Sequence, residues 1–164
     1  MRILPDGSAA FVFMTTAQGL QSVSTIALQG DGQPRQFAPT SVVVSAGGFD
    51  VSSDGRFVAL LIRKDDGGFE MLVVPSTGGD PVRRLAWPRS PPFRWMPDGR
   101  GFAYVDAPTN RNIWVGPLDG GAHRQLTHFT DKTITAFEWS HDGKQLALAR
   151  TTTTSDNVLL KGVR

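Results

Sequence analysis

The feature that most constrains this chain is an internal repeat with a period of 44 residues. The segment FRWMPDGRGFAYV, from Phe93 to Val105, returns as FEWSHDGKQLALA, from Phe137 to Ala149. A third copy, FDVSSDGRFVALLI, begins at Phe49, and a weaker copy, RILPDGSAAFVFM, begins at residue 2. A fixed period of this length predicts that one structural unit is built four times and stacked on itself.

Two columns align across the copies. The aromatic column contains Phe49, Phe93 and Phe137. The turn column contains Asp6, Asp54, Asp98 and Asp142, each followed by glycine. Asp hydrogen-bonds its own backbone and Gly accepts a positive φ, so each pair predicts a tight turn between two antiparallel strands. The four carboxylates are therefore interpreted as turn residues and not as a carboxylate cluster.

The copy that starts at Phe93 predicts four short strands. They are Phe93–Trp95, Phe102–Val105, Ile113–Val115 and Arg124–Thr127. The last strand is the most polar, as is typical of an outer edge. Four strands per 40–45 residues are typical of a propeller blade, and no stretch has the 3.6-residue period of a helix. We expect an all-β propeller with these side chains buried: Phe93, Phe102, Tyr104, Trp114, Phe137, Leu146 and Leu148.

The repeat boundaries predict one domain over residues 1–164, with blades at about 1–40, 41–88, 89–130 and 131–164. The first copy begins inside its first strand. The fourth copy ends after a third strand, expected at Asn157–Leu160, with no fourth. We therefore expect an open arc that is an incomplete part of a larger ring, and a closed four-bladed ring is the alternative. Open sheet edges of such an arc favour self-association.

The repeat cores, with GGxxRxLT after them, resemble the WD40-like PD40 repeats of TolB-type β-propellers. Departures from that pattern are Val51, Ser53 and His141. The resemblance implies a ring of the six-bladed type. The final segment, from Gln125 to Arg164, resembles the end of propellers fused behind bacterial serine/threonine protein kinases.

This resemblance implies a non-catalytic interaction or sensor module of a larger bacterial signalling protein. Its partner would be a protein or peptide, or else a small ligand. Two alternatives stay open. One is the accessory propeller of a prolyl-oligopeptidase-type hydrolase, and the other is a TolB-like periplasmic interaction protein.

Composition narrows the class of partner. The net charge of +2 over 164 residues is too small to indicate nucleic acid, and no cysteine is present for disulfides or thiolate metal sites. The longest apolar runs, Ala9–Met14 and Phe57–Ile62, have six residues, whereas a membrane-spanning helix needs about 20. The first 20 residues lack the pattern of a signal peptide. The compartment, periplasm or cytoplasm, is left open.

Motifs for catalysis and cofactor binding are missing from the sequence. It contains no GxSxG nucleophile elbow, no phosphate-binding GxxxxGK[ST] loop and no HRD triplet. His123, His128 and Asp131 lie within nine residues, but their spacing matches no familiar zinc pattern. We therefore predict no catalytic residues, no metal site and no cofactor in this chain.

The candidate binding site is a rim on one face of the propeller. The links between blades and the loops between second and third strands share a face. Trp95 and Trp139 share a column and are interpreted as blade-packing residues, whereas Trp87 lies in the link LAWPRSPPF and could be an exposed aromatic. The predicted rim comprises Trp87, Arg89, Asn110, Arg111, His128 and Asp131, beside the Thr151–Ser155 run.

Overall fold

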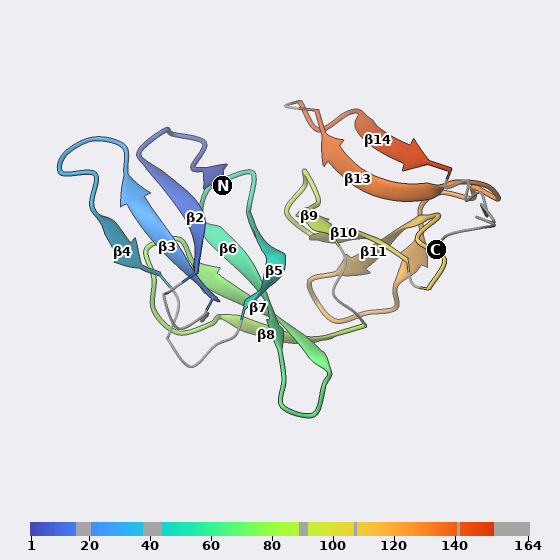
Figure 1. Cartoon of the computed structure of the whole chain (residues 1–164), viewed down its shortest axis with the longest axis horizontal. Coiled ribbons are helices and arrows are strands. Elements are labelled where there is room, and N and C mark those ends of the chain that lie inside the picture. Colours follow the sequence, from blue (N-terminus) through green and yellow to red (C-terminus); the bar gives the residue numbers. More distant parts are fainter. Residues whose placement is uncertain (16–20, 38–43, 89–91, 107, 141, 153–164) are drawn as a thin grey trace, which may run out of the picture.

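Figure 1 shows the computed structural model of the chain, which describes residues 1–15, 21–37, 44–88, 92–106, 108–140 and 142–152. Within these ranges every regular element is a β-strand and no helix occurs, so none is present that could cross a membrane. The prediction of an all-β fold is confirmed.

The strands form four antiparallel sheets, in which each strand pairs with its neighbours in sequence. The first sheet contains β1 (Arg2–Ile3), β2 (Ala9–Thr15), β3 (Gln21–Ala27) and β4 (Pro34–Gln36). The second contains β5 (Val44–Val51), β6 (Phe57–Arg63), β7 (Phe69–Pro75) and β8 (Arg83–Trp87). The third contains β9 (Phe93–Trp95), β10 (Gly101–Val105), β11 (Ile113–Pro117) and β12 (Arg124–Gln125). The fourth contains β13 (Thr133–Trp139) and β14 (Leu146–Thr151).

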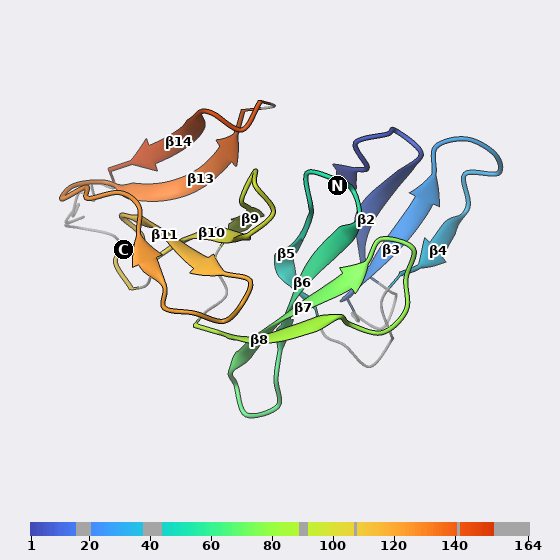
Figure 2. The same cartoon turned by 180° about the vertical axis from the view of Figure 1, so that it is seen from behind.

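The four sheets fan out around a common axis, with the first strand of each sheet innermost (Figures 1 and 2). Strands β1, β5, β9 and β13 therefore line the axis, and β4, β8 and β12 lie at the outside. An open sector separates the first sheet from the fourth in both views. This is the arrangement of propeller blades, each sheet being one blade.

Three apolar clusters hold consecutive sheets together. The first joins Phe11 and Val23 to Phe49 and Leu60, between the first two sheets. The second lies between the second and third sheets around Phe102. The third cluster joins Ala103, Val105 and Ile113 to Ile134 and Phe137, between the third and fourth sheets. Consecutive blades thus bury their facing sides against each other, as expected of a repeat unit that cannot bury them alone.

The Asp-Gly turns have the predicted conformation. Gly55, Gly99 and Gly143 adopt φ of +71°, +69° and +69°. In each turn the aspartate Oδ1 accepts a hydrogen bond from the backbone N–H two residues later, as from Arg56 to Asp54 at 3.0 Å. The carboxylates of the turn column are thus structural, as the sequence predicted.

Some expectations of detail were wrong. Phe93, Phe102, Tyr104 and Phe137 are buried as expected, but Trp114, Leu146 and Leu148 are only half-buried. The two leucines lie on the fourth sheet, which has two strands among the described residues and so offers less cover. The strand expected at Asn157–Leu160 lies outside the described residues.

Candidate functional site

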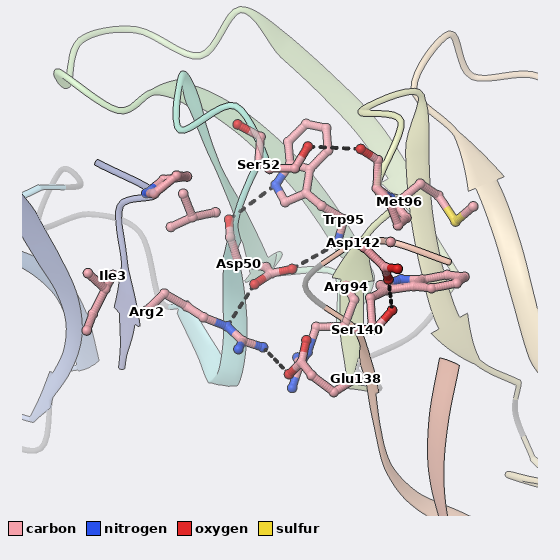
Figure 3. A pocket seen from close by; sticks show the side chains of 16 residues that line it. Arg2, Ile3, Asp50, Ser52, Arg94, Trp95, Met96, Glu138, Ser140 and Asp142 are labelled. Carbon is pink, nitrogen blue, oxygen red and sulfur yellow. Dashed lines mark hydrogen bonds and ion pairs between the residues drawn. The ribbon is translucent and has the colours of Figure 1, made fainter. Parts of the chain in front are cut away.

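The structure places one charged residue from each blade at the propeller axis. These are Arg2 on β1, Asp50 on β5, Arg94 on β9 and Glu138 on β13 (Figure 3). They occupy one repeat column, which in the later copies is the position after the repeated phenylalanine, and they alternate in sign. In every sheet the inner strand pairs with the second strand in an equivalent register. The same repeat column therefore lies at the axis in all four sheets.

The axial residues form a continuous chain of ion pairs (Figure 3). Arg2 Nε lies 2.8 Å from Asp50 Oδ1, and Arg2 Nη2 lies 3.1 Å from Glu138 Oε2. Arg94 Nε donates to the same Glu138 oxygen at 2.8 Å. Arg2 therefore links the first blade to both the second and the fourth, across the axis.

Asp50 is the most enclosed of the four charges. Its side chain is 8% exposed, and its Oδ2 accepts a hydrogen bond from the Trp95 backbone N–H at 2.8 Å. Burial raises the pKa of the Asp50 carboxyl above its ordinary value, while Arg2 and the Trp95 N–H act in the opposite direction. Asp50 thus ties the second blade to the third through Trp95 and to the first through Arg2.

Glu138 is the most accessible of the four charges. Its side chain is 52% exposed, against 27% for Arg2 and 19% for Arg94. Two guanidinium groups hold its carboxylate in place while leaving half of its surface open to a ligand. The axis therefore presents a fixed anion flanked by two cations.

A cavity of about 420 Å³ opens beside these charges. Its lining combines the axial residues with apolar side chains, which include Ile3, Trp95, Met96 and Trp139, and with the Asp-Gly turns. Serine hydroxyls of the lining are engaged in those turns: Ser52 Oγ donates to Asp54 and Ser140 Oγ donates to Asp142. The lining therefore offers charges of both signs, hydrogen-bonding groups and apolar surface to a ligand.

Neighbouring turns also contact one another around the cavity. A Cβ atom added at Gly143 would meet Pro97 of the preceding blade at 2.5 Å, and one at Gly55 would meet Pro5 at 2.9 Å. Ser53 stands where the first and third blades have proline, and its hydroxyl donates to the Pro97 carbonyl at 3.0 Å. The turns thus form a continuous wall for the cavity.

The structure places the predicted rim at the other end of the blades. Asn110 and Arg111 lie on the β10–β11 loop, and His128 and Asp131 lie on the β12–β13 link, all exposed. The two segments meet where the Ile134 N–H donates to the Asn110 carbonyl at 2.6 Å. The loop and the link therefore lie beside each other.

Buried Asn112 fixes the two segments of the rim to each other. Its Nδ2 donates to the Phe129 carbonyl at 3.2 Å, and its Oδ1 accepts from the Phe129 N–H at 2.6 Å. Asp131 accepts from Arg150 Nη2 at 2.7 Å, and the Arg150 guanidinium stacks 3.8 Å from the Phe129 ring centroid. The Asp131 carboxylate is therefore already paired, whereas the side chains of Asn110, Arg111 and His128 are exposed.

Two of the predicted rim residues have a different outcome. Trp87 is 5% exposed, so the expectation of an exposed aromatic was wrong. It is the last residue of β8, and its ring packs against Phe102, Tyr104 and His123 between the second and third sheets. Arg89 lies outside the described residues.

His123 belongs to the same aromatic cluster. The Tyr104 hydroxyl lies 2.7 Å from His123 Nδ1, and burial lowers the pKa of the imidazole. No group of three or more potential metal ligands occurs among the described residues. His123 is thus accounted for by packing between blades.

Sequence reasoning missed the axial site because it searched for catalytic motifs and exposed aromatics. The signal was present in the repeat alignment, as a column that reads Arg, Asp, Arg, Glu between otherwise conserved turn and aromatic positions of the copies. A charged residue flanked by buried ones on an inner strand needs a partner, and alternating signs supply it.

Comparisons with known proteins agree with this architecture. No protein-family model matches the chain. An uncharacterized protein of Agrobacterium fabrum is 28% identical over 127 residues, which cover 76% of this chain and 41% of that protein.

Solved structures give a clearer result. A structure described as a TolB candidate from Agrobacterium tumefaciens matches with a TM-score of 0.67 and 21% identity, over 90% of this chain and 51% of that one. TolB from Acinetobacter baumannii matches with a TM-score of 0.73 and 19% identity, over 94% of this chain and 38% of that one. The Swd1 β-propeller domain from Myceliophteria thermophila gives 0.60 and 14%, over 92% of this chain and 47% of that one.

The chain therefore has a β-propeller fold, and TolB propellers are among its structural relatives. It spans about half or less of the length of each relative named here. At these identities the structural likeness concerns the fold alone.

Proposed function

We propose that this chain is a non-catalytic interaction module that binds a peptide segment of a partner protein in its axial cavity. The observation that carries the proposal is the cavity of about 420 Å³ in which both signs of charge lie beside apolar side chains. Ligand pockets have volumes of this order, and a few fixed polar groups among apolar ones orient a ligand. A polypeptide supplies matching amides, charges and side chains.

Glu138 is the group on which a test is built, because its carboxylate is fixed and half exposed. Peptides would be selected from a random displayed library on the immobilised chain, and their dissociation constants measured for Glu138→Gln. We expect about 2- to 10-fold weaker binding, which corresponds to roughly 0.5–1.5 kcal/mol. Glu70→Gln is the matched control, since Glu70 pairs with Arg84 at 3.2 Å away from the cavity and should leave affinity unchanged.

The exposed rim is a second candidate surface. Asn112 and its bonds to Phe129 hold the rim loops in a defined shape, as a recognition surface requires. If the selected peptides lose affinity in Arg111→Ala and keep it in Glu138→Gln, the rim is the binding site and the axial proposal is wrong.

We further propose that this chain is part of a larger bacterial signalling protein with an associated serine/threonine kinase. The resemblance of residues 125–164 to kinase-fused propellers supports it. Reading the coding sequence on both sides of this chain tests it: a kinase fold upstream supports the assignment. A GxSxG domain would favour the hydrolase-associated alternative, and neither domain would favour a TolB-like interaction protein.

A further inference from the structure

The two axial arginines keep hydrogen-bond donors that their ion pairs do not use. The Arg2 guanidinium contacts Asp50 and Glu138 through Nε and Nη2. The Arg94 guanidinium uses Nε for Glu138 and Nη1 for the Phe93 carbonyl. Arg2 Nη1 and Arg94 Nη2 therefore have no partner among the described residues. Neither belongs to the buried polar atoms that lack a partner, so both are accessible from the cavity side.

The carboxylate of Glu138 keeps a free acceptor beside those donors. Its contacts with Arg2 Nη2 at 3.1 Å and Arg94 Nε at 2.8 Å are both made by Oε2. Oε1 has no partner within the described part of the chain, and the side chain is 52% exposed. Figure 3 shows these three side chains pointing toward one another at the cavity. A ligand there meets one free carboxylate oxygen and two free guanidinium nitrogens.

The other charged and hydroxyl side chains of the described lining are engaged. Both oxygens of Asp50 are bound, and its side chain is 8% exposed. The hydroxyls of Ser52, Ser53 and Ser140 each donate within or between turns. Asp142 accepts from the Ser140 hydroxyl in its own turn. The polar selectivity of the cavity is therefore expected to come from the free atoms at the axis.

The signs of the axial charges restrict which ligand group fits. The two guanidinium groups and two carboxylates cancel, so the axis has no net charge to attract an ion. A ligand carboxylate would be attracted by the arginines and repelled by Glu138, and an ammonium group would meet the reverse conflict. An apolar group would cover the free oxygen and nitrogens without pairing them, which is costly. A neutral group that both donates and accepts avoids all three penalties.

The primary carboxamide of glutamine or asparagine is such a group. Its carbonyl oxygen has two lone pairs for the two guanidinium groups, and its NH₂ donates to Glu138 Oε1. A backbone amide fits less well, because the N–H and C=O of a trans peptide point in opposite directions. The carboxamide uses only free atoms, so the ion pairs of Arg2 with Asp50 and Glu138 stay intact. Ile3 and Trp139 line the same cavity and offer apolar contact to the rest of the ligand.

We propose that the bound peptide inserts the carboxamide of a glutamine or asparagine side chain between Arg2, Arg94 and Glu138. The inference rests on the proposed function, because it names the chemical group that the axial cavity selects. Glu138 is then the residue that distinguishes the amide from the corresponding acid, since only the amide can donate to it.

A series of ligand side chains tests this on the unmodified chain. The ligand would be a library-selected peptide that shifts the backbone amide signals of the inner strands. It should contain a glutamine or asparagine at which Gln→Met or Gln→Glu, or else Asn→Leu or Asn→Asp, weakens binding about 10- to 100-fold. Met and Leu remove the polar end at similar size, and Glu and Asp replace the donor by a charge that Glu138 repels.

Glu138→Gln should change this preference. The variant can donate to a ligand carboxylate and leaves the axis with a net positive charge. The acidic form of the peptide should therefore bind it at least about 10-fold more tightly than it binds the unmodified chain. The matched control is Glu70→Gln, because Glu70 pairs with Arg84 at 3.2 Å away from the cavity. It should keep the original preference for the amide.

Three outcomes would overturn the inference while axial binding stands. They are a required lysine or arginine in the peptide, an affinity that none of the amide replacements changes, and a preference for the amide that Glu138→Gln leaves unaltered. The ligand series needs no variant of the chain, so it decides the matter even if Glu138→Gln disturbs the Arg2 contact. Shifts confined to the rim amides would instead refute axial binding itself, and this inference with it.

Discussion

The packing between neighbouring turns can be tested by comparing how much alanine destabilises the chain at two glycines that share the same backbone conformation. Gly99 and Gly143 both have φ of +69°. A Cβ atom at Gly99 would meet nothing within 4 Å, whereas one at Gly143 would meet Pro97 Cβ at 2.5 Å. Alanine at either position is strained by the left-handed backbone, but only at Gly143 must the preceding blade also move.

The expected magnitudes follow from these two terms. A left-handed alanine costs about 1–2 kcal/mol, and the loss of backbone freedom in the unfolded chain offsets about 0.4–1 kcal/mol of it. Gly99→Ala should therefore lower the free energy of unfolding by about 0.5–1 kcal/mol. Gly143→Ala adds the displacement of Pro97, for which overpacking costs of about 1–3 kcal/mol are typical.

Urea unfolding followed by tryptophan fluorescence would give both values, with the m-value confirming that the same transition is compared. Gly7→Ala is a further control, because Gly7 has φ of +70° and open space. It should match Gly99→Ala. Equal destabilisation at Gly99 and Gly143, or a larger effect at Gly99, would contradict the inter-turn packing described above.

Two further predictions concern the rim and the aromatic cluster. Asn112→Ala removes the buried amide that pairs with the Phe129 N–H and carbonyl and should cost about 2–3 kcal/mol in urea unfolding. Asn110→Asp, at an exposed position, should cost less than about 0.5 kcal/mol, and equal effects would contradict the role of Asn112. Burial lowers the pKa of His123 in the folded chain below its ordinary value of 6.5. Below that value the unfolded chain therefore binds more protons than the folded chain, and the free energy of unfolding falls as the pH drops toward the folded pKa. His123→Phe should lose less stability than the unmodified chain between about pH 7.5 and 5.5, and identical pH profiles would refute this.

The repeat predicted most of the fold because the residues that recur in it determine local backbone conformation. Asp-Gly at a fixed period specifies the same turn wherever it occurs, and Gly55, Gly99 and Gly143 all have the expected positive φ. Strand order followed from the spacing between turns and apolar runs. These properties depend on neighbours in sequence, which an internal repeat displays directly.

The site was harder to predict because it depends on contacts between blades. Trp87 ends a strand that begins with two arginines and precedes a proline-rich link, and both neighbours in sequence indicate exposure. It is buried because the third sheet brings Phe102 and Tyr104 against it. Likewise, Arg2 and Glu138 are 136 residues apart and meet only at the axis. Such contacts between residues far apart in sequence cannot be inferred from local patterns. The alternating charges in the repeat column were the signal in the sequence that an axial site exists.

The most direct test of the central claim is to locate the bound peptide by NMR. Backbone amide shifts of the chain would be followed during titration with a peptide selected as described above. Binding in the axial cavity predicts that the largest changes occur at Ile3, Val51, Trp95 and Trp139, on the four inner strands that line it. Changes confined to Asn110–Asn112 and Thr127–Asp131, with the inner strands unaffected, would contradict the account.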